Sequence, residues 1–83
     1  MDTNKIKNAI NEAARNGKKT AMMHYQFLIH ADELRGVNTK EFCTDIGLQE
    51  SYSTELNKMI SLAALMREQG VTIKKADSSL RSE

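Results

Sequence analysis

The stretch QESYSTELNK, residues 49–58, holds most of the side chains with a recognisable binding chemistry. Amides and hydroxyls both donate and accept hydrogen bonds, which is the chemistry that nucleic-acid base edges present, and an ammonium can pair with a phosphate. Two carboxylates, Glu50 and Glu55, lie in the same stretch and would repel phosphates. The chemistry is that of recognition rather than catalysis, and the residues that carry it are Gln49, Ser51, Thr54, Asn57 and Lys58.

Residues that could serve catalysis or metal binding are few and badly spaced. His24 and His30 would lie roughly 120° apart around one helix, so they cannot hold one ion together. We expect His30 to be a partly buried histidine with one hydrogen bond, and Cys43 to fill a small gap between helices. Asp32 and Glu33 are adjacent and do not face one site. We therefore expect no enzymatic activity, no cofactor and no metal.

Composition limits the chain to one small domain. It has 83 residues, of which 40% are hydrophobic and 28% are charged, and its net charge is +1. This is not the strongly basic balance typical of nucleic-acid-binding proteins, although a local patch matters more than the total. A single Cys excludes a disulfide framework. The longest apolar stretch, near residues 61–66, is too short to span a bilayer, and no signal peptide is evident, so we expect a cytoplasmic protein without a membrane partner.

The glycines divide the chain into segments of helical length. Proline is absent, and the four glycines stand at positions 17, 36, 47 and 70. Glycine commonly follows the last residue of a helix, because it adopts the left-handed backbone found there. We therefore predict an all-α, four-helix domain with helices over about residues 3–16, 20–35, 39–46 and 50–69. Asp2 or Thr3 can cap the first helix, and Asn38 the third, where Glu41 completes a capping-box pattern.

The apolar pattern of each predicted helix indicates its place in the fold. The second is apolar around most of its girth, which is typical of a central helix. The fourth carries more apolar surface than one partner helix can cover, and the residues after Gly70 alternate as in a short extended segment. We expect this surplus to form a homodimer interface through Leu62, Leu65, Met66, Val71 and Ile73. The folded domain is expected to span residues 1–75, followed by a polar, disordered tail at 76–83.

The segment EFCTDIGLQESYSTEL, residues 41–56, has the spacing of two helices that cross at a tight turn. Cys43 provides a small residue at the crossing, and Gly47 stands where the turn needs a left-handed backbone. Leu48 follows the turn and Leu56 anchors the second helix. The first helix of the pair has its buried side at Phe42 and Ile46.

This segment resembles the helix-turn-helix superfamily of bacterial DNA-binding regulators. The wider stretch from Met22 to Gly70 is similar to small helix-turn-helix-like proteins of bacterial mobile elements. Ser53 departs from the pattern, because the superfamily usually buries Val or Ile there. The resemblance implies a homodimeric, sequence-specific transcriptional regulator of double-stranded DNA, with a helix-turn-helix formed by helices three and four. Its implied contact residues are Gln49, Ser51, Tyr52, Ser53, Thr54, Asn57 and Lys58, with Thr39 and Lys40 near phosphates.

The same pattern fits two other interpretations. Two packed helices joined by a glycine would produce it without any binding role. A module that keeps the helix-turn-helix shape but binds another protein, such as a mobile-element inhibitor of a host protein, is favoured by Glu50 and Glu55. Further basic residues precede this segment in the chain, and their place relative to it depends on the tertiary fold; they are Lys5, Lys7, Arg15, Lys18 and Lys19.

Overall fold

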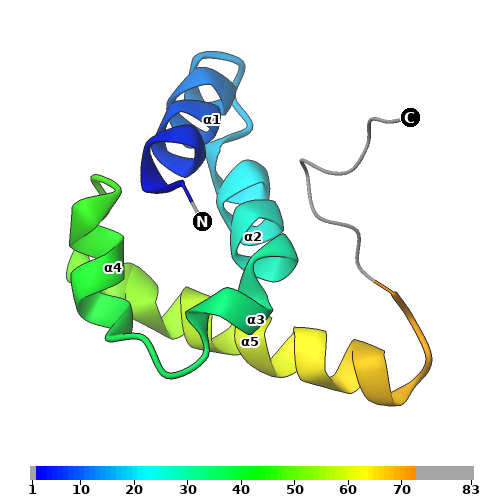
Figure 1. Ribbon diagram of the computed structural model, residues 1–83. Coiled ribbons are helices and arrows are strands. Elements are labelled where there is room, and N and C mark those ends of the chain that lie inside the picture. The colour runs from blue at the N-terminus through cyan, green and yellow to red at the C-terminus, as the bar shows by residue number, and fades with distance from the viewer. Residues whose placement is uncertain (1, 73–83) are drawn as a thin grey trace.

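The computed structural model describes residues 2–72, which form an all-α fold, as predicted (Figure 1). Within this range no strand is found, and Val71 and Thr72 carry no regular structure. Ile73 and the predicted tail, residues 76–83, lie outside the described residues. The elements are α1 (Thr3–Arg15), α2 (Lys19–Ile29), α3 (Ala31–Leu34), α4 (Thr39–Asp45), the 3-10 helix η1 (Glu50–Tyr52) and α5 (Ser53–Glu68).

The helix ends follow from local sequence signals. Each of the four glycines has a positive φ and stands just after a helix, as predicted. At the other ends, the Asp2 carboxylate accepts hydrogen bonds from the backbone N–H groups of Asn4 and Lys5, at 2.9 and 3.2 Å. The Asn38 side chain accepts from the N–H of Glu41 at 3.1 Å. These caps satisfy N–H groups that have no partner inside the helix.

The second predicted helix is shorter than expected, and this part of the prediction is wrong. The α-helix ends at Ile29, His30 leaves the helical conformation with φ −105° and ψ 14°, and the short α3 follows in a new direction. The bend buries Ala31 and Leu34. It also brings Asp32 of α3 to Arg67 of α5, with which it forms an ion pair.

Helix α2 lies between α1 and α5 and contacts both, so its predicted central place is confirmed (Figure 1). The rings of Phe27 from α2 and Phe42 from α4 pack edge to face, with centroids 6.4 Å apart. The helix is not buried on every side, because Tyr25 is 47% exposed, and the polar Gln26 is among its buried residues. The main core consists of Ile6, Ile10, Met23, Phe27, Leu34, Phe42, Cys43, Ile46, Leu48 and Leu56.

Candidate nucleic-acid interface

The turn between α4 and α5 has the geometry of a helix-turn-helix. The backbone N–H of Gly47 donates to the carbonyl of Thr44 at 3.1 Å, and that of Leu48 donates to Cys43 at 2.8 Å. Such a pair of bonds at the end of a helix requires a left-handed backbone at the residue that donates the first bond. This residue is Gly47, which has φ +85°. Leu48 is buried directly after the turn. The turn therefore fixes the angle at which the next helix leaves α4.

Helix α5 buries one side against the rest of the domain. Leu56 is fully buried and anchors the helix, as predicted. Ser53 is only 7% exposed. It occupies the inward position where related motifs carry a larger apolar residue, so it is not available as the surface contact that the resemblance implied. Tyr52 is half-buried in the 3-10 turn η1 that precedes α5.

The opposite side of η1 and the first half of α5 is exposed and mainly polar. Side chains three, four and seven positions apart share one face of a helix, so Ser51, Thr54 and Lys58 lie in one row. Within residues 49–61 the exposed charged side chains are those of Glu50 and Lys58. The exposed polar residues in this range are Gln49, Ser51, Thr54, Asn57, Lys58 and Ser61, and all of them except Ser61 were predicted as contacts.

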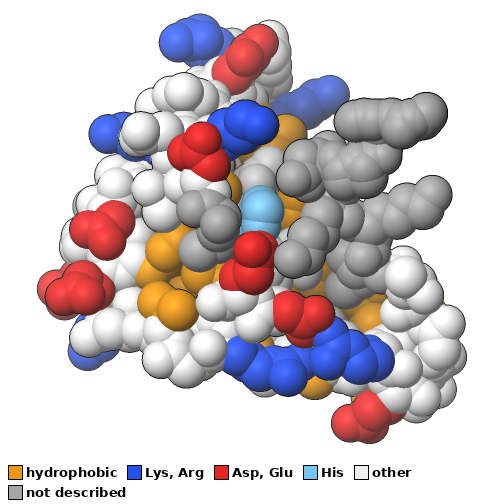
Figure 2. Space-filling view, viewed as in Figure 1, with side chains coloured by type: hydrophobic (Ala, Val, Ile, Leu, Met, Phe, Trp, Pro, Cys, Tyr) orange, Lys and Arg blue, Asp and Glu red, His pale blue; other side chains and the backbone are white. Residues whose placement is uncertain are grey.

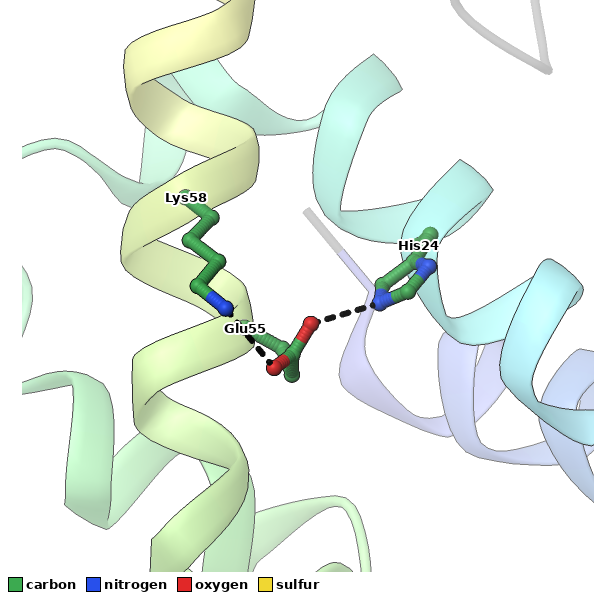
Figure 3. Close-up of polar contacts among 3 residues, drawn as sticks. All are labelled: His24, Glu55 and Lys58. Carbon is green, nitrogen blue, oxygen red and sulfur yellow. Dashed lines mark hydrogen bonds and ion pairs between the residues drawn. The ribbon is translucent and has the colours of Figure 1, made fainter.

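Glu55 does not belong to this exposed row, although sequence reasoning placed it there. Its carboxylate points toward α2, where Oε1 lies 3.0 Å from Nε2 of His24 (Figure 3). The ammonium of Lys58 lies 3.4 Å from the other oxygen, Oε2. The hydrogen bond with His24 and the charge of Lys58 lower the pKa of Glu55 below the 4.5 of an unperturbed glutamate. Its negative charge is therefore partly balanced within the protein.

The two residues predicted at the start of α4 differ in exposure. Thr39 is half-buried, whereas Lys40 is exposed and free to project from the first turn of the helix. Exposed carboxylates are found on the same helix at Glu41 and Asp45. On the face shown in Figure 2, basic and acidic side chains are interspersed.

Two lysines outside the helix-turn-helix also reach it, which sequence reasoning did not establish. A Cβ placed on Gly47 would lie 3.5 Å from Cε of Lys7, so this α1 side chain runs alongside the turn. The ammonium of Lys19, at the start of α2, lies 5.9 Å from the ring centroid of Tyr52. Both contacts join residues far apart in the chain, so no local sequence pattern indicates them.

The other reactive residues lie away from this surface chemistry. Cys43 is fully buried between helices, and burial raises the pKa of its thiol, which favours the inert protonated form. His30 is half-buried, with Nδ1 3.0 Å from Glu33 Oε1, which confirms the expected histidine with one hydrogen bond. Across residues 2–72 no group of three or more His, Cys, Asp or Glu side chains is placed to hold a metal ion.

The second half of α5 changes from polar to apolar on its outer side. Leu62 is 39% exposed and Leu65 is 50% exposed, while Met66 is half-buried. Val71, just after the helix, is 48% exposed. These are the described members of the predicted dimer interface. None of the helices in residues 2–72 has the length and apolar character needed to cross a membrane.

The comparison with protein-family models agrees with this geometry. The model described as an HTH-like domain matches residues 3–69, which is most of the chain. The protein therefore belongs to the HTH-like domain family, and the suspected helix-turn-helix resemblance is confirmed. No curated protein and no solved structure matches the chain.

Proposed function

We propose that the protein is a small transcriptional regulator that binds double-stranded DNA through η1 and the first half of α5. The observation that carries the proposal is the exposed polar row beyond the turn, with Gln49 and Thr54 as base contacts. A major groove admits one α-helix, and amides and hydroxyls match its base edges. Lys40 and Lys58 are proposed to hold phosphates on either side, which would fix the register of the helix.

The orientation of Glu55 supports this proposal. Two carboxylates on a groove-facing helix would oppose binding, because the duplex is a polyanion. Glu55 instead lies against His24 of α2 and pairs with Lys58. Within residues 49–61, Glu50 remains the exposed carboxylate, and it would lie close to the DNA.

The active form is proposed to be a homodimer that binds a two-fold symmetric site. The exposed apolar side chains of Leu62, Leu65 and Val71 support this assignment. Leu62 and Leu65 follow the polar row along α5, and Val71 comes just after the helix. A partner on these side chains would leave the polar half of α5 open. Two recognition helices in successive major grooves would lie about 34–36 Å apart.

The function is tested by titrating a labelled duplex from the region upstream of the protein's own gene, starting at low salt, where the attraction of cations to phosphates is strongest. The proposal expects binding that is tighter to this duplex than to an unrelated duplex of equal length. Absence of binding to both duplexes at the lowest salt would contradict it.

A protein-interaction module is the second candidate, and the exposed carboxylates Glu41, Asp45 and Glu50 around the turn favour it. Glu50→Lys separates the two functions, because reversing this charge should strengthen DNA binding and weaken capture of a protein partner. Glu55 is unsuitable for this purpose, since its reversal would also break the contact with His24.

A further inference from the structure

The helix-turn-helix segment by itself is poorly suited to a polyanion. Residues 39–58 contain two lysines, Lys40 and Lys58, and four carboxylates at Glu41, Asp45, Glu50 and Glu55. One of those lysines is already paired with Glu55. Proteins that bind duplex DNA neutralise several phosphates with cations. If the segment binds DNA, most of the required positive charge must come from elsewhere in the fold.

The turn receives one such cation from α1. Lys7 is exposed, and its aliphatic stem passes Gly47 at van der Waals distance, as given by the 3.5 Å between Cε and a Cβ built on the glycine. A larger residue at position 47 would stand beside this stem. Cε, the carbon that carries the ammonium, therefore lies next to the turn that precedes η1 and α5. In Figure 1 the start of α1 lies beside the end of α4.

The 3-10 helix η1, which precedes α5, lies beside a second cation, from α2. The exposed Lys19 places its ammonium 5.9 Å from the centroid of the Tyr52 ring. A cation over an aromatic face is attracted by the negative face of the ring, which favours this position without removing the ammonium from solvent. Tyr52, which the resemblance implied as a DNA contact, thus also attracts the ammonium of Lys19 to this position.

We propose that Lys7 and Lys19 are phosphate-binding residues of the DNA interface, which therefore extends beyond the helix-turn-helix to α1 and α2. The inference rests on the proposed function. Lys7 lies next to the turn and Lys19 next to η1. Both side chains therefore lie near the N-terminal end of α5, which is proposed to enter the groove. Together they offset the excess of carboxylates in residues 39–58 and supply contacts that hold the duplex without distinguishing its sequence.

The chain provides a matched control for each lysine. Lys5 lies roughly 200° from Lys7 around α1, and so on another side of that helix. Lys18 adjoins Lys19 in sequence but lines the groove between α1 and α2, together with Asn16 and Tyr25. Each control removes the same charge from nearly the same place in the chain. A difference within a pair therefore reports the position of the charge rather than the net charge.

The test measures duplex affinity by fluorescence anisotropy from about 50 to 200 mM salt, a range over which phosphate contacts make affinity fall steeply. It compares wild type with the variants Lys7→Ala, Lys19→Ala, Lys5→Ala and Lys18→Ala. Each phosphate contact contributes about 0.9 to the slope of log affinity against log salt. Lys7→Ala and Lys19→Ala should each lower the slope by about this amount per bound protomer, on the upstream duplex and on an unrelated one alike. Lys5→Ala and Lys18→Ala should keep the wild-type slope, as should Lys7→Arg and Lys19→Arg.

The two proposals fail in distinguishable ways. If wild type binds the duplex but Lys7→Ala and Lys19→Ala have the same slope as their controls, the extended interface is wrong and the proposed function stands. If wild type binds no duplex at the lowest salt, the proposed function fails and the extended interface fails with it. Thermal melts of all variants check that each one is folded, so that weaker binding reports a lost phosphate contact and not unfolding.

Discussion

Glu55 bears directly on whether the start of α5 suits a nucleic acid, because its charge lies within that stretch. From sequence alone, its place in QESYSTELNK suggests a charge facing the partner. In the structure it bonds to His24, which is distant in sequence, so the interpretation changes once the two helices are packed together. Local patterns locate a residue on a helix, but the neighbour that determines its charge environment comes from the tertiary fold.

The contact of Glu55 with His24 and Lys58 predicts a pH-dependent contribution to stability. The pKa of Glu55 is lowered in the folded protein, so folding favours its ionised form. This contribution is present above the unfolded pKa near 4.5 and is lost as the pH falls through the lower folded value. Glu55→Gln should therefore unfold at lower denaturant than wild type at pH 7, and the gap should close as the pH falls well below 4.5.

Urea unfolding at several pH values checks this expectation, with Glu50→Gln as a control that removes the same charge from an exposed position. The control should stay close to wild type throughout. A constant gap between Glu55→Gln and wild type from neutral to acid pH would show that the ionised carboxylate contributes nothing to the fold.

For whole elements, the sequence predicts helix ends better than bends within helices. The four glycines correctly mark helix ends because a left-handed residue is a local requirement of the backbone. The bend at His30 has no comparable signal, since neither glycine nor proline stands there. It follows from the burial of Ala31 and Leu34, and such packing is set by the whole domain.

The turn between α4 and η1 should depend on Gly47 through its backbone. Its φ of +85° is unfavourable for any residue with a Cβ. Among residues 2–72, an added Cβ would meet only Lys7 Cε, at an ordinary contact distance of 3.5 Å. Gly47→Ala should therefore lower the free energy of unfolding by about 1–2 kcal/mol, mainly through backbone strain. Gly47→Asn should cost less, because asparagine tolerates the left-handed region. Denaturant melts that place alanine at or above asparagine and glycine would contradict this account of the turn.

For the molecule as a whole, the sequence predicts the helix-turn-helix but not the surroundings of the proposed binding face. Phe42, Cys43, Ile46, Gly47, Leu48 and Leu56 identify the motif because their spacing is local. The approach of Lys7 and Lys19 joins segments far apart in the chain, and no period in the sequence encodes it. The apolar half of α5 is an intermediate case, since periodicity predicts the surplus surface and the fold determines how much remains exposed.

That surplus predicts self-association. Burial of Leu62, Leu65 and Val71 against a second copy would remove apolar surface from water, which is favourable in proportion to the area buried. Sedimentation at micromolar concentration should give about twice the chain mass of 9.4 kDa. Leu62→Lys/Leu65→Lys should give the mass of one chain while remaining helical. A wild-type protein that sediments as a monomer at high concentration would contradict the dimer.

The central claim, that the start of α5 binds DNA with sequence preference, is tested most directly by comparing Gln49→Ala with Lys58→Ala on two duplexes, the upstream sequence and an unrelated one. Gln49→Ala should cost about 1–3 kcal/mol on the upstream duplex alone, because only a base contact distinguishes sequences. Lys58→Ala should weaken binding to both duplexes alike and lower the salt slope by about one unit. Equal losses on both duplexes for Gln49→Ala, or no change for either variant, would contradict the claim.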